Sequence, residues 1–226
     1  MQFIHADNED KGIQEMADRI VQALSNGAKV LWLVCGGSNI PFSVEAMNII
    51  RQSVGNSALA NLTVGLTDER YGPVEHSDSN WKLLLENGFL LSGVSQMPML
   101  SGKPLEETVC SYADRLKAVM SGITALNGLI VAQFGMGADG HIAGIFPHSV
   151  AVSDQRFVCG YKADTFTRMT LTPVALKEVM TAYAFVFGNT KRAALRRLHD
   201  EDLSVDEQPA QILKQIKEVS LYSDQI

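Results

Sequence analysis

Residues 129–147 read LIVAQFGMGADGHIAGIFP, an apolar run that ends abruptly in three glycines. The glycines enclose Asp139, and His141 follows at once. A continuous apolar run of this length is typical of a strand buried on both faces, as in a parallel sheet. Glycines let the backbone turn sharply and approach another group closely. The stretch therefore predicts a buried strand that carries Asp139 and His141 to a loop at the mouth of the sheet.

Outward from this stretch, helix-like and strand-like segments alternate along the chain. The expected helices cover residues 11–27, 41–54, 79–88, 106–120, 190–199 and 209–216, and the expected strands cover 29–37, 62–70, 128–135, 156–162, 168–173, 182–188 and 219–223. Apolar strands separated by helices indicate a mainly parallel sheet that is covered on both faces. We therefore expect a doubly wound α/β fold, with residues 1–226 forming a single domain.

Composition narrows the class of protein. The 226 residues are 46% hydrophobic and 19% charged, which is ordinary for a globular protein, and the net charge of -6 argues against nucleic acid as a partner. Three scattered cysteines without a CxxC pair fit free thiols in a reducing compartment. The first residues lack the pattern of a signal peptide, and no apolar stretch reaches the roughly 18 residues of a membrane span. We expect a cytoplasmic protein that binds no membrane.

The segment CGGSNIP, residues 35–41, has the character of a phosphate-binding loop. Gly36 and Gly37 permit close backbone approach, Ser38 offers a hydroxyl, and the expected helix that follows presents free N–H groups. The segment matches neither a P-loop nor a dinucleotide fingerprint. A plain strand-to-helix turn is the equally weighted alternative.

Two cationic side chains later in the chain, Lys191 and Arg168, are candidates to bind the same phosphate group. Lys191, in FGNTKRAAL, lies in the first turn of an expected helix, where a positive charge is poorly placed for the helix dipole. A bound anion would explain that position, and a solvated surface lysine is the alternative. Arg168, in RMTLTP, alternates with apolar residues and either points into the same pocket or is an exposed strand residue.

The segment LTDERYGPVEHSDSN, residues 66–80, places Asp68, Glu69 and Arg70 at the end of an expected strand. Charges at such a position are costly to bury unless they are paired or bound to a ligand. Arg70 can grip a phosphate with its planar guanidinium. The alternative is a loop in which Asp68 and Glu69 pair with Arg70. We interpret the nearby His76 as local structure.

Asp139 and His141 are the types of residue that general-base hydrolysis uses. A histidine can accept a proton from water near neutral pH, and a nearby carboxylate can fix its orientation. The chain has no HExxH or comparable cluster for a metal ion and no GxSxG elbow for a serine nucleophile. A histidine that merely packs in its loop is the alternative, which the surrounding glycines make less attractive.

Taken together, the segments resemble the 6-phosphogluconolactonase family, within the wider group that includes glucosamine-6-phosphate deaminase. The resemblance follows the order GGSNIP, TDERYGPVEHSDSN, GMGADGHIAGIFP, RMTLTP and FGNTKRAAL across most of the chain. The second and third segments are the specific ones, because the family shows a DER…H.DSN element followed by GMGxDGHxAxxFP.

The resemblance implies hydrolysis of 6-phospho-D-glucono-1,5-lactone to 6-phosphogluconate in the oxidative pentose phosphate pathway, without a metal ion or cofactor. His141 matches the general base, and Asp139 would orient it. The positions expected around the small sugar-phosphate substrate are Gly36, Gly37, Ser38, Asp68, Arg70, Arg168 and Lys191. The sequence leaves a monomer or a small homo-oligomer open.

Two departures from the lactonase sequence pattern leave other functions open. The first loop of the lactonases is closer to GGSTP, whereas Asn39 and Ile40 precede the proline here. After the histidine the lactonases read TASLFP and this chain reads IAGIFP, with an isoleucine that is also seen in the deaminases. The deaminases, however, carry DEY in place of DER and a glutamate shortly after the histidine, which residues 142–147 lack. A silent sugar-phosphate sensor is a third alternative, disfavoured because Asp139 and His141 are both retained.

Overall fold

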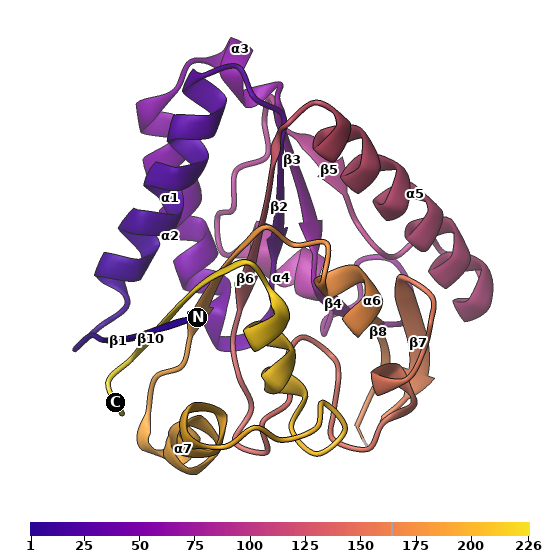
Figure 1. Ribbon diagram of the computed structural model, residues 1–226. Coiled ribbons are helices and arrows are strands. Elements are labelled where there is room, and N and C mark those ends of the chain that lie inside the picture. The colour runs from indigo at the N-terminus through magenta and orange to yellow at the C-terminus, as the bar shows by residue number, and fades with distance from the viewer. Residues whose placement is uncertain (164) are drawn as a thin grey trace.

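A sheet of seven parallel strands forms the centre of the protein (Figure 1), in a computed structural model that describes residues 1–163 and 165–226. All neighbouring strands in this sheet run parallel. In spatial order the strands are β1 (Gln2–His5), β10 (Glu218–Ser223), β9 (Thr181–Phe185), β6 (Leu129–Phe134), β2 (Val30–Val34), β3 (Leu62–Leu66) and β5 (Ser95–Met97). The strands β2, β6 and β9 are buried along their whole length, which agrees with their unbroken apolar sequences.

The strand order reverses between β2 and β6. From β2 the chain proceeds outward to β3 and β5, and from β6 it proceeds outward in the opposite direction to β9 and β10. In doubly wound sheets, ligands bind beyond the carboxyl ends of the strands at such a reversal. The two loops at this point are those that follow β2 and β6, so the glycine loop at residues 35–37 and the Asp139–His141 loop meet there.

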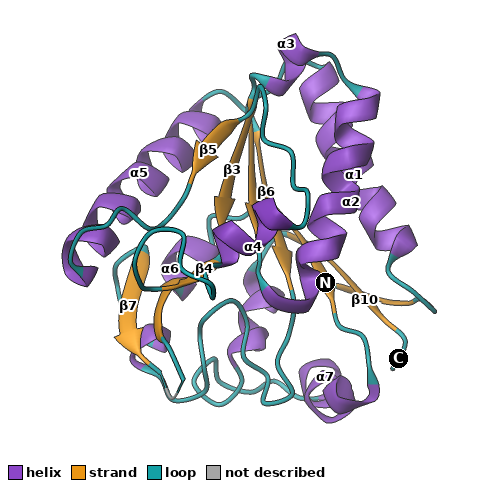
Figure 2. Cartoon of the chain, turned by 180° about the vertical axis from the view of Figure 1, so that it is seen from behind, coloured by secondary structure: helices purple, strands orange, loops and turns teal. Residues whose placement is uncertain are grey.

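Helices cover both faces of the sheet. Figures 1 and 2 show α1 and α2 on one side of it and α5 on the other. The apolar stripe Ile13, Met16, Ile20 and Leu24 is buried and anchors α1. The helices are α1 (Asp10–Ser25), α2 (Ile40–Ser53), α3 (Asn56–Leu59), α4 (Asn80–Glu86), α5 (Leu105–Ala125), α6 (Pro173–Leu176) and α7 (Arg192–Asp200), with 3-10 turns η1 (Gly37–Asn39), η2 (Val150–Val152), η3 (Asn189–Lys191) and η4 (Pro209–Gln215). The expected doubly wound α/β fold is confirmed.

A second, antiparallel sheet changes one prediction. It contains β4 (Asp68–Arg70), β8 (Thr167–Leu171) and β7 (Val158–Lys162). The single strand expected over residues 62–70 is therefore wrong, because the chain leaves the main sheet at Thr67. There the backbone N–H donates to Val34 at 2.9 Å, and the carbonyl of Thr67 accepts from Leu171 at 2.9 Å, so one residue links both sheets. A continuous strand-like pattern does not reveal such a change of partner.

Smaller differences lie at the edges of the fold. The sequence pattern missed β1, β5, α3 and α6, which are three to four residues long and too short for a periodic signal. The helix expected over residues 209–216 is the 3-10 helix η4. Within the described ranges, no helix is both long and apolar enough to cross a membrane.

Candidate active site

A small polar cavity of about 140 Å³ lies at the reversal point of the sheet. Residues from the loops after β2 and β6 form it together with β4, α4, β8 and η3. The lining residues are Cys35, Gly36, Gly37, Ser38, Asn39, Asp68, Arg70, Asn80, Gly135, Met136, His141, Ala143, Arg168 and Lys191. The structure thus brings together every site residue expected from the sequence except Asp139, which contacts His141 and lines a neighbouring cleft.

The first loop requires its glycines for two different reasons. Gly37 has a φ of +66°, a left-handed conformation that favours glycine. Gly36 lies directly against Asn80, because a Cβ atom at Gly36 would come within 2.0 Å of the Asn80 Oδ1 atom. Ser38 follows in η1, just before α2 begins. Backbone N–H groups at such a helix start favour a bound anion.

Positive charge is concentrated around the cavity. Arg70 and Arg168 face each other across the pairing of β4 with β8, and Lys191 reaches the cavity from η3. Like charges directly opposite in a sheet are destabilising unless something compensates them. Asp68 is the one carboxylate in the lining, and its Oδ2 atom pairs with the Arg168 Nη1 atom at 3.2 Å. Three cations against one carboxylate leave a net positive site that suits a phosphate group.

The alternative in which Asp68 and Glu69 pair with Arg70 is wrong. Asp68 pairs with Arg168, and the carboxylate of Glu69 accepts from the backbone N–H of Arg70 at 2.7 Å without reaching its guanidinium. The Arg70 Nη1 atom instead donates to the Asp78 carbonyl at 3.0 Å. His76 supports this turn as expected, since its Nε2 atom lies 2.9 Å from the Arg70 carbonyl oxygen.

His141 and Asp139 form a close dyad. The His141 Nδ1 atom lies 2.7 Å from the Asp139 Oδ1 atom, which also accepts from the His141 backbone N–H at 3.1 Å. Burial would raise the pKa of the Asp139 carboxyl, but these hydrogen bonds from His141 outweigh it and lower the pKa. An ionised carboxylate only accepts hydrogen bonds, so in the neutral imidazole Nδ1 carries the proton and Nε2 is the acceptor. The side chain of His141 is 31% exposed, so water reaches it.

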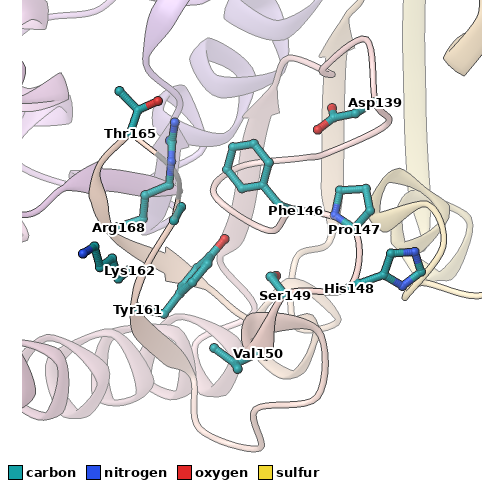
Figure 3. Close-up of a pocket in the computed structure, with 11 residues that line it drawn as sticks. Asp139, Phe146, Pro147, His148, Ser149, Val150, Tyr161, Lys162, Thr165 and Arg168 are labelled. Carbon is teal, nitrogen blue, oxygen red and sulfur yellow. The ribbon is translucent and has the colours of Figure 1, made fainter.

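Phe146 contacts both the dyad and Arg168. Its ring stacks on the His141 ring at a centroid distance of 4.4 Å, and the Arg168 guanidinium lies 4.9 Å from its centroid. Phe146 also lines a wider cleft of about 760 Å³, with Asp139, Tyr161 and Arg168 among its neighbours (Figure 3). The cleft and the polar cavity share Arg168, so a ligand whose anionic end fills the cavity has room to extend past it.

Unpartnered polar atoms gather at the cavity. Five buried side-chain nitrogen or oxygen atoms in the described residues have no hydrogen-bond partner, and three of them belong to Asn39, Arg70 and Asn80 in the cavity lining. Each such atom costs free energy when it is buried. Their concentration at one place indicates that a polar ligand completes the site. Nowhere in the described ranges do three or more His, Cys, Asp or Glu side chains form a group that could hold a metal ion.

Glu69 fixes the loop that carries Arg70. Its fully buried carboxylate accepts from the backbone N–H groups of Arg70, Asn80 and Trp81 at 2.7, 2.6 and 3.0 Å, and from the Ser79 hydroxyl at 2.9 Å. Burial raises the pKa of this carboxyl even though the four hydrogen bonds lower it. The carboxylate thereby ties β4 to the start of α4 and sets the position of Arg70 and Asn80.

We expect Glu69→Gln to lower the free energy of unfolding by about 2–4 kcal/mol, because the new amide N–H₂ faces N–H and O–H donors in a buried site. Urea unfolding at pH 7 measures the change. Glu45→Gln, at an exposed position of α2, is the matched control and should stay within about 0.5 kcal/mol of the parent. Equal unfolding midpoints for both variants would contradict a structural role for the Glu69 carboxylate.

The sequence did not predict roles for Asn39, Asn80 or Phe146, or the supporting role of Glu69. Asn80 and Glu69 belong to the segment of residues 66–80 that contains Arg70. Their partners come from α4 and the glycine loop, which only the fold brings together. Asn39 was visible as a departure from GGSTP. Phe146 was visible only as an apolar residue before a proline.

Comparison with known proteins agrees with this geometry. A curated 6-phosphogluconolactonase of Borreliella burgdorferi is 26% identical over 226 residues, covering 95% of this chain and 92% of that protein. One of Bos taurus is 26% identical over 189 residues, covering 77% and 70%. The crystal structure of 6-phosphogluconolactonase from Thermotoga maritima shares the fold, with a TM-score of 0.75 at 19% identity over 98% of this chain and 99% of that one. The model of the glucosamine-6-phosphate isomerases/6-phosphogluconolactonase family matches residues 6–222, and the chain belongs to that family.

Proposed function

We propose that this chain hydrolyses 6-phospho-D-glucono-1,5-lactone to 6-phospho-D-gluconate, a step of the oxidative pentose phosphate pathway. The observation that carries the proposal is the His141–Asp139 dyad beside a cavity that Arg70, Arg168 and Lys191 make positive. The cations, the Gly36–Gly37 loop and Ser38 hold the phosphate, and Asp68 orients Arg168. Relatives that carry the name 6-phosphogluconolactonase support the substrate.

The reaction follows from the protonation state of the dyad. Nε2 of His141 accepts a proton from a water molecule while the water oxygen attacks the lactone carbonyl carbon. Asp139 keeps the ring in the productive tautomer and stabilises the positive charge that the ring gains. The tetrahedral intermediate then collapses, the bond to the ring oxygen breaks, and the imidazolium returns the proton to that oxygen. No metal ion or cofactor takes part in this scheme.

A glucosamine-6-phosphate deaminase or isomerase is the second candidate, favoured by Ile142 directly after the histidine. Ring opening in those enzymes is assisted by a glutamate shortly after that histidine. Residues 142–147 contain no acid, and Arg70 stands where the deaminases have tyrosine. The lactonase reaction needs neither group, and it is the better match. A silent sensor is the third candidate and would bind the sugar phosphate without turnover.

The wild-type protein tests this choice directly. The lactone is generated in situ with glucose-6-phosphate dehydrogenase, and its disappearance is followed against the spontaneous rate. We expect decay well above the spontaneous rate and no turnover of glucosamine 6-phosphate. Decay at the spontaneous rate would contradict the lactonase assignment. Turnover of the amino sugar would then favour the deaminase, and binding without turnover of either compound would favour the sensor.

We also propose that the protein works in the cytoplasm on this small substrate, as a monomer or small homo-oligomer. The net charge of -6 supports a molecule that avoids nucleic acids and anionic membrane surfaces. The single domain expected over residues 1–226 is consistent with a family model that spans residues 6–222.

A further inference from the structure

Gln208 is a fully buried residue whose side chain lies against the loop that carries the dyad. The contact is with Gly140, the residue between Asp139 and His141: a Cβ atom at Gly140 would come within 2.6 Å of the Gln208 Cγ atom. Gly140 has a φ of +84°, a left-handed conformation that favours glycine, so the loop turns sharply where Gln208 contacts it. The turn that sets Asp139 beside His141 is therefore packed against this side chain.

Hydrogen bonds hold both ends of the Gln208 amide. Its Nε2 atom donates to the Ala194 carbonyl of α7 at 2.7 Å, and its Oε1 atom accepts from the Gln211 Nε2 atom at 2.8 Å. The Gly140 carbonyl in turn accepts from the backbone N–H of Ala210 at 3.0 Å. Because α7 and η4 fix the side chain in this way, it has little freedom to move away from Gly140.

The same segment also fixes the dyad loop on the other side of His141. The backbone N–H of His148 donates to the Asp206 carbonyl at 3.0 Å, and the His148 Nδ1 atom lies 2.7 Å from the Asp206 Oδ2 atom. His148 has a φ of +59°, which a residue other than glycine adopts only where its surroundings hold it. Residues 206–210 therefore contact the loop at two places, one before and one after His141.

The dyad needs such support because its function depends on one tautomer of His141. General-base action requires the proton on Nδ1, whereas a free neutral imidazole prefers the proton on Nε2. The hydrogen bond to Asp139 selects the required form, over a distance of 2.7 Å. A turn that relaxed at Gly140 would lengthen this contact, and the ring would lose its preference for the required tautomer.

We propose that Gln208 is a positioning residue for the dyad. Its side-chain stem, the Cβ and Cγ atoms, packs against Gly140 and keeps the turn closed, so that Asp139 stays in contact with His141. Gln208 lies outside the lining of the polar cavity and acts only through the loop. The inference rests on the proposed function only for the reaction that serves as its activity readout.

Shortening the side chain tests this role. We expect Gln208→Ala to lower kcat for lactone hydrolysis at least about tenfold, because a small misplacement of a reacting group is costly. The Kd for 6-phosphogluconate should stay within about twofold, since Arg70, Arg168 and Lys191 lie on other elements. Gln208→Ser removes the same stem but leaves a hydroxyl, and it should lose kcat as Gln208→Ala does.

Gln208→Met is the conservative variant. Methionine keeps an unbranched stem against Gly140 but makes neither hydrogen bond of the amide, so its Tm should fall. It should nevertheless recover most of the rate that Gln208→Ala loses. Stability and activity therefore change separately in this series, which a residue with a purely structural role would not show.

Thr108→Val controls for the general cost of losing buried hydrogen bonds. The Thr108 hydroxyl is buried in α5, where it donates to the Lys103 carbonyl at 3.0 Å and lies 3.0 Å from the Ser101 hydroxyl oxygen. Thr108 lies outside the cavity lining. The variant should lose stability and keep the kcat of the wild type.

The tautomer of His141 gives a readout that needs no turnover. Long-range proton–nitrogen correlation NMR at mildly alkaline pH measures it, and the signals of His141 are assigned by their loss in His141→Ala. The wild type and Gln208→Met should show the tautomer with the proton on Nδ1. Gln208→Ala and Gln208→Ser should shift toward the tautomer with the proton on Nε2.

The outcomes separate this inference from the proposed function. Unchanged kcat and tautomer in Gln208→Ala would overturn the inference and leave the lactonase reaction standing. A loss of kcat in Gln208→Met as large as that in Gln208→Ala would also overturn it, as would a loss of kcat with an unchanged tautomer. If the wild type hydrolyses no lactone and the tautomer still shifts as expected, the proposed function fails and the positioning role stands.

Discussion

His141→Ala is expected to lower the catalysed rate of lactone hydrolysis at least about a hundredfold, toward the spontaneous rate, because it removes the group that accepts a proton from water. The Kd for 6-phosphogluconate should change little, since the cations and the glycine loop hold the phosphate independently of the imidazole. In steady-state terms, kcat falls while binding survives. The measurement is lactone decay in the coupled assay, with binding followed by calorimetry.

His199→Ala is the matched control for this experiment. The His199 Nδ1 atom lies 2.6 Å from the Asp200 Oδ1 atom, a contact like that of the dyad, but it belongs to the exposed part of α7 and not to the cavity lining. The activity of His199→Ala should equal that of the wild type. Full activity in His141→Ala would mean that the imidazole only packs against Phe146 and that another group activates water.

The sequence predicted the fold where apolar strand patterns are followed directly by polar residues. The unbroken apolar runs of β2, β6 and β9 indicated a covered parallel sheet, and the polar residues after them indicated its carboxyl edge. A site assembled from strand ends follows from that arrangement alone. For this reason Ser38, His141 and Lys191 could be placed near one another before any contact between them was known.

The remaining features depend on contacts between distant segments. Asp68 pairs with Arg168, one hundred residues away, so the alternative that paired it with the neighbouring Arg70 is wrong. The break between β3 and β4 depends on which sheet each strand joins, and a strand-like pattern does not record this. The unpartnered Oδ1 atom of Asn39 became visible only once the structure placed it in the cavity lining, beside α2 and β6. Each of these features is a property of the assembled site.

Gly137→Ala should reduce lactone hydrolysis about as severely as His141→Ala, although it removes no functional group. A Cβ atom at Gly137 would lie 2.0 Å from the His141 Nδ1 atom and 2.3 Å from the Asp139 Oδ1 atom. Because both atoms are side-chain ends, the loop can accept the methyl group by pushing the dyad apart. The expected result is a loss of about a hundredfold in kcat, with the Kd for 6-phosphogluconate retained.

Gly122→Ala separates this effect from the general cost of replacing a glycine. Gly122 lies in α5, and a Cβ atom there meets nothing within 4 Å. Alanine should therefore stabilise that helix by about 1 kcal/mol and leave activity unchanged. If Gly137→Ala keeps wild-type kcat, the contact between Asp139 and His141 is dispensable, and Asp139 is not the residue that orients the base. If kcat collapses while the protein still binds 6-phosphogluconate, the glycine between Met136 and Ala138 is there to leave room for the dyad, which accounts physically for Gly137.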